Sequence, residues 1–307
     1  MNEINCKKGS SVKSQQTAYK YALVAIFLWS TVAAAFKISL EYLSPIELVL
    51  YAVISSTVCL LVVLLYQKKL SLVIIYMKKS YFKIALLGFL NPFLYYVVLF
   101  EAYARLPAQE AQSINYTWAL MLAFMSALFL KQKLSFKDVI AGFICYFGVL
   151  IIATKGEPFS LEFSSIDGVF LALASTVLWS SYWIINTKNK VEPVIGLFSN
   201  FLFSLPFIVL FAFLTESLQS LPPLNGILAA SYVGLFEMGI TFLLWLYAMQ
   251  YAQSTSKIAN LIFLSPFLSL IFIYFIVGEK IYISTVFGLS TIIVGLLIQQ
   301  SKKRKNR

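Results

Sequence analysis

The residues of this chain that could do chemistry are few, and they lie inside long apolar runs. The sequence has no histidine, which removes Ser-His-Asp and Cys-His catalysis and histidine-ligated metals. Its three cysteines are scattered without CxxC spacing, so they indicate neither a disulfide framework nor a zinc site. No Walker sequence is present, which argues against ATP-driven work by this chain. We therefore expect no enzyme, no metal site and no cofactor.

Glu237 is the carboxylate that is expected to lie deepest in a membrane. Counting about 1.5 Å per residue from Gly226, at the start of its apolar run, places it about 16 Å deep. A polar group there costs several kcal/mol unless it is partnered or hydrated, which favours proton coupling or cation binding. The alternative is a structural carboxylate that bonds a neighbouring helix or lies in a wide aqueous cavity. Glu47, Glu101 and Glu110 are expected near the ends of their runs, where solvation is cheap.

A Trp-Ser pair occurs at the centre of two of the apolar runs, as Trp29-Ser30 and as Trp179-Ser180. Tryptophan in membrane proteins usually lies at the two membrane–water interfaces. A position near the midplane therefore favours the aromatic wall of a solute cavity. Helix packing at an axis between two repeats is the alternative interpretation.

Polar side chains on two further runs, and on the run of Trp179, complete the candidate cavity. Pro92 interrupts the hydrogen-bond ladder of its helix and exposes backbone to a ligand, although a kink without ligand contact is the alternative. The remaining candidates offer hydroxyl, amide and indole groups but no fixed charge, and such a lining suits neutral or zwitterionic solutes. They are Asn91, Tyr95 and Tyr96 on one run, Asn115, Tyr116 and Trp118 on the next, and Ser181, Tyr182 and Asn186 beside Trp179.

The elements that must position these residues are membrane-spanning helices. Of the 307 residues, 60% are hydrophobic and 12% are charged, far from the roughly 25% charged content of a soluble domain. Ten apolar segments are long enough, at about 20 residues, to cross a hydrocarbon core of about 30 Å. They are 19–38, 46–66, 82–103, 107–130, 136–154, 167–187, 193–214, 225–248, 254–277 and 281–299.

The net charge of +11 is explained better by membrane topology than by nucleic-acid binding, because the lysines and arginines cluster between apolar segments. With the N-terminus inside, 20 of the 24 basic residues fall in cytoplasmic segments and four fall outside. Basic loops on one side of the membrane therefore alternate with loops that have few basic residues on the other. If the number of spans were wrong by one, this alternation would be lost. We therefore expect ten spans with both termini cytoplasmic, and no nucleic-acid partner.

An internal repeat divides the chain. FLWSTVAAAFK at 27–37 matches VLWSSYWIINTK at 177–188, FEAYA at 100–104 matches LWLYA at 244–248, and LKQKLSFKDV at 130–139 matches VGEKIYISTV at 277–286. Five spans per copy is an odd number, so the second copy is inverted relative to the first, which is the geometry of alternating access. Glycines such as Gly148 and Gly295 predict close helix packing, within a monomer or in a homodimer.

LWST at 28–31, INYTWAL at 114–120 and LSPFLSLIFIYFIVGEK at 264–280 resemble the drug/metabolite transporter superfamily, EamA-type, over nearly the whole chain. LWST with NYTWA is similar to its branch of aromatic amino acid exporters. That resemblance implies a ten-helix fold around a central cavity and export of amino acids or related metabolites. The chain departs at Ala119, where the family often has proline, and at Gln132, which stands where the second half has Glu279.

Together these patterns predict a multi-pass secondary transporter of the plasma membrane of a bacterial cell, exporting amino acids or similar small polar metabolites. Its organisation would be a cytoplasmic tail at 1–18, repeats at 19–155 and 167–299, and a basic tail at 300–307. Uptake of a vitamin, carboxylate or other nutrient, or drug export, is the alternative within the superfamily. A membrane-embedded enzyme or a channel is the alternative from another class, but the sequence shows neither a nucleophile elbow nor a filter sequence.

Overall fold

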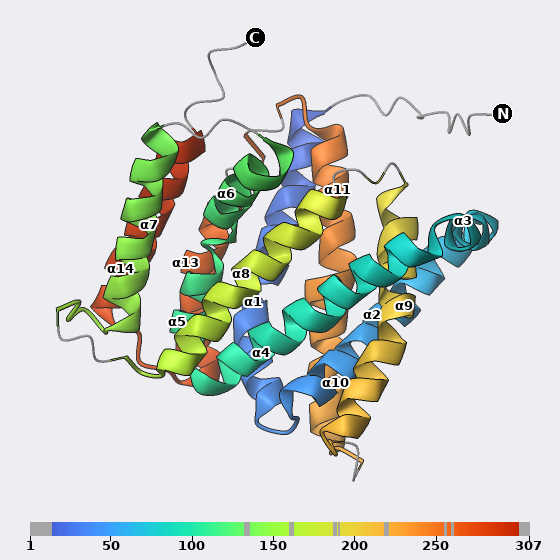
Figure 1. The fold of residues 1–307 in the computed structure, drawn as a ribbon, viewed down its shortest axis with the longest axis horizontal. Coiled ribbons are helices and arrows are strands. Elements are labelled where there is room, and N and C mark those ends of the chain that lie inside the picture. Colours follow the sequence, from blue (N-terminus) through green and yellow to red (C-terminus); the bar gives the residue numbers. More distant parts are fainter. Residues whose placement is uncertain are drawn as a thin grey trace.

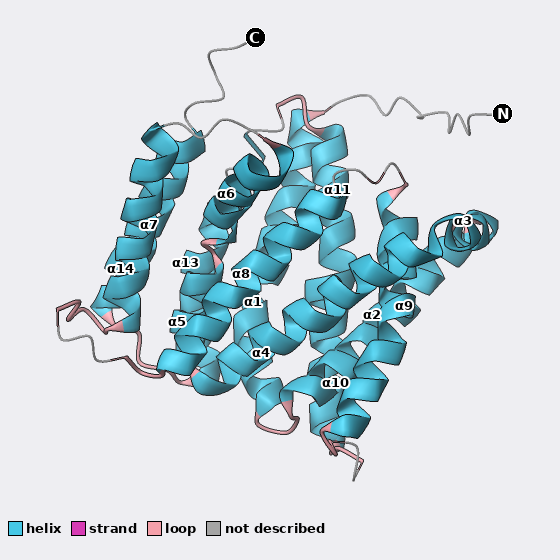
Figure 2. Ribbon diagram, in the orientation of Figure 1, coloured by secondary structure: helices cyan, strands magenta, loops and turns pink. Residues whose placement is uncertain are grey.

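The computed structural model describes residues 14–131, 136–159, 163–186, 189, 191–217, 221–254, 257–258 and 261–300, and all of its regular elements in these ranges are helical (Figures 1 and 2). The prediction of an all-α membrane protein is confirmed. Gln132, and the basic residues of the two tails before position 14 and after position 300, lie outside the described residues.

The first repeat contains α1 (Gln15–Leu40), α2 (Pro45–Tyr66), α3 (Leu70–Gly88), η1 (Phe89–Leu94), α4 (Tyr95–Arg105), α5 (Ala108–Asn115), α6 (Trp118–Leu130) and α7 (Phe136–Ala153). The second contains α8 (Ile166–Asn186), α9 (Pro193–Leu214), α10 (Leu224–Val233), η2 (Gly234–Gly239), α11 (Ile240–Tyr251), η3 (Leu261–Leu264), α13 (Ser265–Phe272), η4 (Ile273–Val277) and α14 (Ile283–Gln300).

Within the described residues, eight helical runs are long and apolar enough to cross a membrane, and two shorter apolar helices follow at Ile262–Val277 and Ile283–Gln299. These ten elements correspond to the ten predicted segments. The third run differs most, because it begins at Leu70 instead of near residue 82 and continues through α3, η1 and α4 to Arg105. The residues from Leu70 to about residue 82, which the sequence predicts to be a lysine-rich loop, are therefore helical.

Local sequence explains where several helices begin. Ser44 caps α2: its hydroxyl accepts from the Glu47 backbone N–H, and the Glu47 carboxylate accepts from the Ser44 N–H at 2.8 Å. Proline follows as the first residue of α2, and Pro193 occupies the same position in α9. A missing N–H costs nothing at a first helical position, and the fixed φ of proline suits the helix.

The two repeats pack on each other in a reciprocal pattern. Helix α1 packs on α11, and α8, which is the second-repeat counterpart of α1, packs on α4, the counterpart of α11. Helix α2 packs on its own counterpart α9, and α7 on its counterpart α14, which lie side by side at one edge of the bundle (Figure 1). A two-fold relation between the repeats produces this exchange of partners. The matched sequence runs and the packing therefore describe the same symmetry.

Two glycines bring the repeats into backbone contact at related places. A Cβ added to Gly88 would collide with the carbonyl oxygen of Asn200, and one added to Gly234 would collide with that of Ala52. Gly234 lies 146 positions after Gly88, and Asn200 lies 148 after Ala52, within the spread of the repeat offsets. Small residues at such crossings let helix backbones approach closely. Each repeat thus supplies one glycine and one carbonyl to the other.

At each of these glycines the helix widens into a π-turn, which begins one residue after Gly88 and at Gly234 itself. In the first repeat this is η1, where Asn91 departs from helical geometry with φ −148° and ψ 118° and is followed by a cis bond to Pro92. In the second repeat it is η2, which holds Glu237 between Gly234 and Gly239. Single π-turns inside α-helices occur frequently at functional sites. Both repeats therefore place a polar residue at an irregular turn in the middle of their third spanning element.

Candidate functional site

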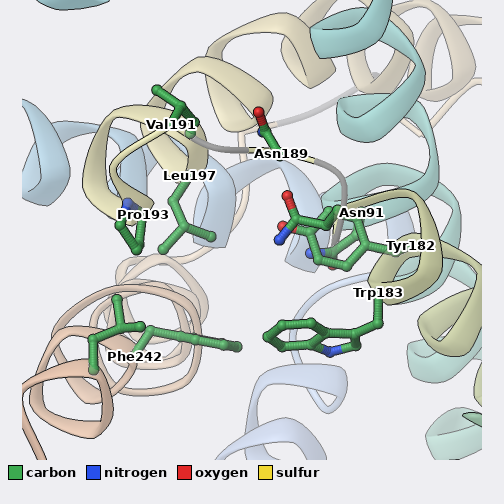
Figure 3. Close-up of a pocket in the computed structure, with 11 residues that line it drawn as sticks. Asn91, Tyr182, Trp183, Asn189, Val191, Pro193, Leu197 and Phe242 are labelled. Carbon is green, nitrogen blue, oxygen red and sulfur yellow. The ribbon is translucent and has the colours of Figure 1, made fainter. Parts of the chain in front are cut away.

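A cavity of about 140 Å³ lies between η1 of the first repeat and three helices of the second (Figure 3). Its lining residues come from η1, from α8, from the connection to α9, and from α9 and α11. They are Asn91, Tyr182, Trp183, Asn186, Asn189, Val191, Pro193, Gly196, Leu197, Phe242 and Leu246. We call the end of the cavity that is lined by the connection between α8 and α9 its mouth.

Helical spacing explains why these side chains meet. Tyr182 and Asn186 are four residues apart on α8, as are Phe242 and Leu246 on α11, so each pair shares one face of its helix. Figure 3 shows the rings of Trp183 and Phe242 pointing toward one another across the cavity. Asn91 reaches the same space because the irregular backbone of η1 interrupts the regular helix there.

Two polar atoms of the lining residues are fully buried and have no hydrogen-bond partner among the residues that the structure describes. They are Oδ1 of Asn91, an acceptor, and Nε1 of Trp183, a donor. The Tyr182 hydroxyl lies beside the amide of Asn91. A buried polar atom without a hydrogen bond costs about 1–3 kcal/mol, so a solute or water that supplies the missing partners is stabilised there. None of the lining residues that the structure describes is charged, which suits a neutral or zwitterionic occupant.

Glu237 lies outside this lining, on the neighbouring turn before α11. Its Oε1 accepts a hydrogen bond from the hydroxyl of Tyr96 at 3.1 Å, and its backbone carbonyl accepts one from Nε1 of Trp29 at 3.5 Å. Tyr96 belongs to α4, so the bond to the carboxylate connects the first repeat to the second. Glu237 is half-buried, whereas Tyr96 is almost completely buried.

The two tryptophans of the repeated Trp-Ser pairs both contact Phe242, behind the cavity wall. The ring of Trp29 lies 5.6 Å from that of Phe242, edge to face, and the ring of Trp179 lies 6.2 Å from it. Trp179 also packs on Tyr95, with ring centroids 4.7 Å apart, and on Tyr182 at 5.9 Å. Aromatic pairs at these distances add about 0.5–1.5 kcal/mol beyond the area that they bury. The tryptophans therefore hold in place two rings, Phe242 and Tyr182, that line the cavity.

The end of the bundle opposite the cavity mouth is closed by hydrogen bonds between the repeats. The carboxylate of Glu279 accepts from the backbone N–H groups of Ala108 at 2.7 Å and Gln109 at 3.4 Å, at the start of α5. The Gln109 side chain in turn donates to the Lys280 carbonyl and accepts from Thr285. Within the first repeat, Lys37 of α1 donates to two carbonyls at the end of α4 and just beyond it. Carboxylates at helix N-termini and cations at C-termini are both favourable.

Comparison with known proteins gives this architecture a family. The sequence pattern of the EamA-like transporter family matches residues 16–154 and 166–299, which together make up most of the chain. The chain belongs to this family. It is therefore a multi-pass membrane transporter of the drug/metabolite superfamily, built from two EamA repeats.

Individual relatives match the transporter over most of its length. An uncharacterized transporter of Archaeoglobus fulgidus is 24% identical over 283 residues, covering 91% of this chain and 97% of the relative. The uncharacterized transporter YoaV of Bacillus subtilis is 23% identical and covers 88% and 92%. A solved crystal structure with 19% identity covers 95% of this chain and all of its own, with a TM-score of 0.68. At that identity the likeness concerns the fold alone.

Three of the residues that the sequence proposed for a solute cavity, Asn91, Tyr182 and Asn186, line the observed one. The others lie around it. Tyr95, Trp29 and Trp179 belong to the aromatic layer behind the wall, Ser30 and Ser180 are fully buried, and the Ser180 hydroxyl donates to the Trp118 carbonyl. Asn115 donates to Ser175 at 2.9 Å, and Tyr116 lies near Ser265. Their part in solute binding stays a prediction.

Sequence reasoning missed Trp183, Phe242 and the first residues of α9. Trp183 could have been found, since it lies one residue beyond Tyr182 and one helical turn beyond Trp179. Phe242 and Leu246 could not have been found in this way. In a spanning helix, the sequence does not distinguish an apolar side chain that faces lipid from one that faces a cavity.

Glu110 lies near the end of its span as expected, but the expected solvation there was wrong. Glu110 is 0% exposed and not solvated at a helix end, because α5 packs against α7 and α8 there. Its Oε1 accepts from Ser164 at 2.8 Å, and its Oε2 is buried without a hydrogen bond to another described residue. Counting residues from the end of a span measures depth along the helix and says nothing of what packs around that end.

Proposed function

We propose that this transporter exports a small neutral or zwitterionic metabolite, of amino-acid type, by alternating access through the cavity at Asn91. The observation that carries the proposal is that the described lining has no charged residue and holds an acceptor, Asn91 Oδ1, and a donor, Trp183 Nε1, that are both buried without a hydrogen bond to another described residue. A solute with one donor and one acceptor group satisfies both. The resemblance to amino acid exporters supports the same class of solute.

The size of the cavity favours the smaller members of that class. At about 140 Å³ it is comparable to an engineered protein cavity of about 150 Å³ that holds benzene. Amino acids with short side chains, or metabolites of that size, fit this volume better than tryptophan does. We expect the aromatic rings of Trp183 and Phe242 to pack on the carbon skeleton of the solute.

The orientation follows from the lysine and arginine distribution. With both termini cytoplasmic, the cavity mouth between α8 and α9 faces the cytoplasm, and the hydrogen bonds of Glu279 and Gln109 close the external end. Export then requires these external bonds to open while the mouth closes. Repeats at 19–155 and 167–299, between cytoplasmic tails at 1–18 and 300–307, would move against each other, in the plasma membrane of a bacterial cell.

Glu237 is proposed to couple this movement to a proton or a cation. Its carboxylate bonds Tyr96 of the other repeat, and its turn is followed directly by α11, which supplies Phe242 to the cavity. A group that gains or loses a cation at this place changes a bond between the repeats, which is what a coupling residue must do.

Transport assays in proteoliposomes test the function. A panel of small neutral and zwitterionic metabolites is offered to the purified protein, together with Asn91→Leu, Trp183→Phe and, as a control, Glu101→Gln at the distant Glu101–Arg105 ion pair. We expect saturable flux that falls at least about tenfold in Asn91→Leu, since replacing a hydrogen bond to solute costs about 1.4 kcal/mol or more. Flux that never saturates, or that is equal in all variants, would contradict the proposal.

A further inference from the structure

Helix α3 is two segments with different directions. At Ser80 the backbone leaves helical geometry, with φ −135° and ψ 26°, and this kink separates residues 70–79 from the part that crosses the membrane. Figure 1 shows the beginning of α3 at the edge of the bundle viewed almost along its axis, while α4, farther along the same run, lies across the view. The segment before Ser80 therefore runs across the direction of the spanning part.

The exposed side chains of residues 66–83, which comprise this segment and its two flanks, are basic, aromatic and apolar. Lys68, Lys78 and Lys79 are exposed and Lys83 is partly so. Tyr66 is 89% exposed and Phe82 is 77% exposed, and Tyr81, Ile74 and Ile75 are at least half exposed. We call the outer surface of residues 66–83 the basic interfacial surface.

No acidic residue occurs between Glu47 and Glu101, so nothing in this part of the sequence neutralises the lysines. Lys69 forms an ion pair with Glu192. The other lysines of the surface have no ion pair to another described residue. Four positive charges thus remain unbalanced beside exposed aromatic rings.

We propose that the basic interfacial surface binds the headgroups of anionic phospholipids. Isoleucine, tyrosine and phenylalanine side chains enter the boundary between headgroups and acyl chains, and lysines extend from it toward phosphate groups. A cluster of four or more lysines next to a spanning helix is a recognised attractor of anionic lipid. A zwitterionic lipid has no net charge to balance the lysines, which gives the surface its selectivity.

The location of the surface gives this binding a consequence. From its inner side, the Tyr76 hydroxyl accepts a hydrogen bond from Asn189 at 2.8 Å, and Lys69 pairs with Glu192 at 2.5 Å. Asn189 lines the cavity, and Glu192 precedes the first residue of α9. Bound lipid therefore holds a segment that is hydrogen-bonded to the cavity mouth.

Lipid selectivity can be measured without knowing the solute. The full-length protein is reconstituted in phosphatidylcholine bilayers that contain spin-labelled phosphatidylglycerol or spin-labelled phosphatidylcholine, and the motionally restricted fraction of each is compared. The variant is K78Q/K79Q/K83Q. The matched control is K137Q/K155Q/K280Q, which removes the same charge from exposed lysines elsewhere.

We expect the unmodified protein to prefer phosphatidylglycerol about fivefold or more, and the preference to fall below about twofold in K78Q/K79Q/K83Q but not in the control. Raising salt from about 0.1 M to about 1 M, which shortens the Debye length from about 10 Å to about 3 Å, should remove the preference in the unmodified protein. That measurement does not depend on the folding of any variant. Equal preference in all three proteins, or a preference that survives high salt, would overturn the proposal.

Discussion

The hydroxyl of Tyr96 donates a hydrogen bond of 3.1 Å to Oε1 of Glu237, and this bond joins α4 of the first repeat to η2 of the second. The same turn of η2 receives the indole N–H of Trp29 at its backbone carbonyl. Glu237 is thus held from two sides while its carboxylate remains half-buried. If the repeats move against each other during transport, the Tyr96–Glu237 bond has to be remade in each cycle.

Replacing Glu237 with glutamine should uncouple transport without unfolding the protein. The amide still accepts a hydrogen bond from Tyr96, but it no longer binds a proton or cation. We expect flux driven by a proton or cation gradient to fall at least about tenfold, while exchange of labelled for unlabelled solute continues. Gradient-driven and exchange flux are compared in the same proteoliposomes.

Tyr96→Phe is the matched control, because it removes the partner hydroxyl and keeps the carboxylate. A charge-assisted hydrogen bond contributes about 1.5–3 kcal/mol, so this variant should slow both kinds of flux yet retain the gradient dependence. Unchanged gradient-driven flux in Glu237→Gln would show that the carboxylate is structural.

The glycine contacts between the repeats predict that alanine at Gly88 and alanine at Gly234 lower the stability of the protein by similar amounts. Alanine at Gly88 would press its Cβ against the Asn200 carbonyl, and alanine at Gly234 would press against that of Ala52. Backbone cannot rotate away, and overpacking of this kind costs about 1–3 kcal/mol. We expect both variants to lower the thermal unfolding temperature in detergent by similar amounts. Gly142→Ala is the control, since it meets only the tip of the Phe124 ring and should change little.

The membrane architecture could be predicted because a spanning segment must bond its own backbone and remain apolar for about 20 residues. Every span therefore appears in the sequence as a long apolar run. In addition, Pro45 and Pro193 indicate where helices begin in both repeats. The helical turns from Leu70 to Lys79 do not form such a long apolar run. Lysine pairs at 68–69 and 78–79 read as a loop, whereas the structure makes the residues between them helical.

The cavity was predictable only where a polar or helix-breaking residue stood out from its apolar run. Asn91 is next to Pro92, and Tyr182 and Asn186 follow a Trp-Ser pair. Phe242 and the burial of Glu110 depend on which helices pack together, a property of the tertiary fold. Trp29 and Trp179 stood out equally well, yet they support the wall from behind, because a large indole fills the space between helices before it reaches the cavity.

Two substitutions on α8 should separate cavity lining from helix packing. Asn186 lines the cavity and is partly exposed to it, whereas Ser180 is fully buried and bonds the Trp118 carbonyl. Asn186→Leu should lower flux several-fold and leave the unfolding temperature within a degree or two. Ser180→Leu should instead lower stability by about 1–3 kcal/mol through overpacking. If Ser180→Leu is fully stable and loses flux, Ser180 belongs to the solute path.

The bond between Glu279 and the start of α5 predicts a graded loosening of the closed end. Replacing a side chain that accepts from the first N–H groups of a helix with alanine costs about 0.5–2 kcal/mol. We expect amide hydrogen exchange at Ala108 and Gln109 to accelerate about twofold to thirtyfold in Glu279→Ala, and less in Glu279→Gln, because the amide oxygen still accepts without charge. Lys280→Gln is the control, since Gln109 bonds the Lys280 backbone and not its side chain. If Glu279→Ala leaves exchange at these two amides unchanged, the carboxylate does not hold the end closed, and the Gln109 side chain alone must do so.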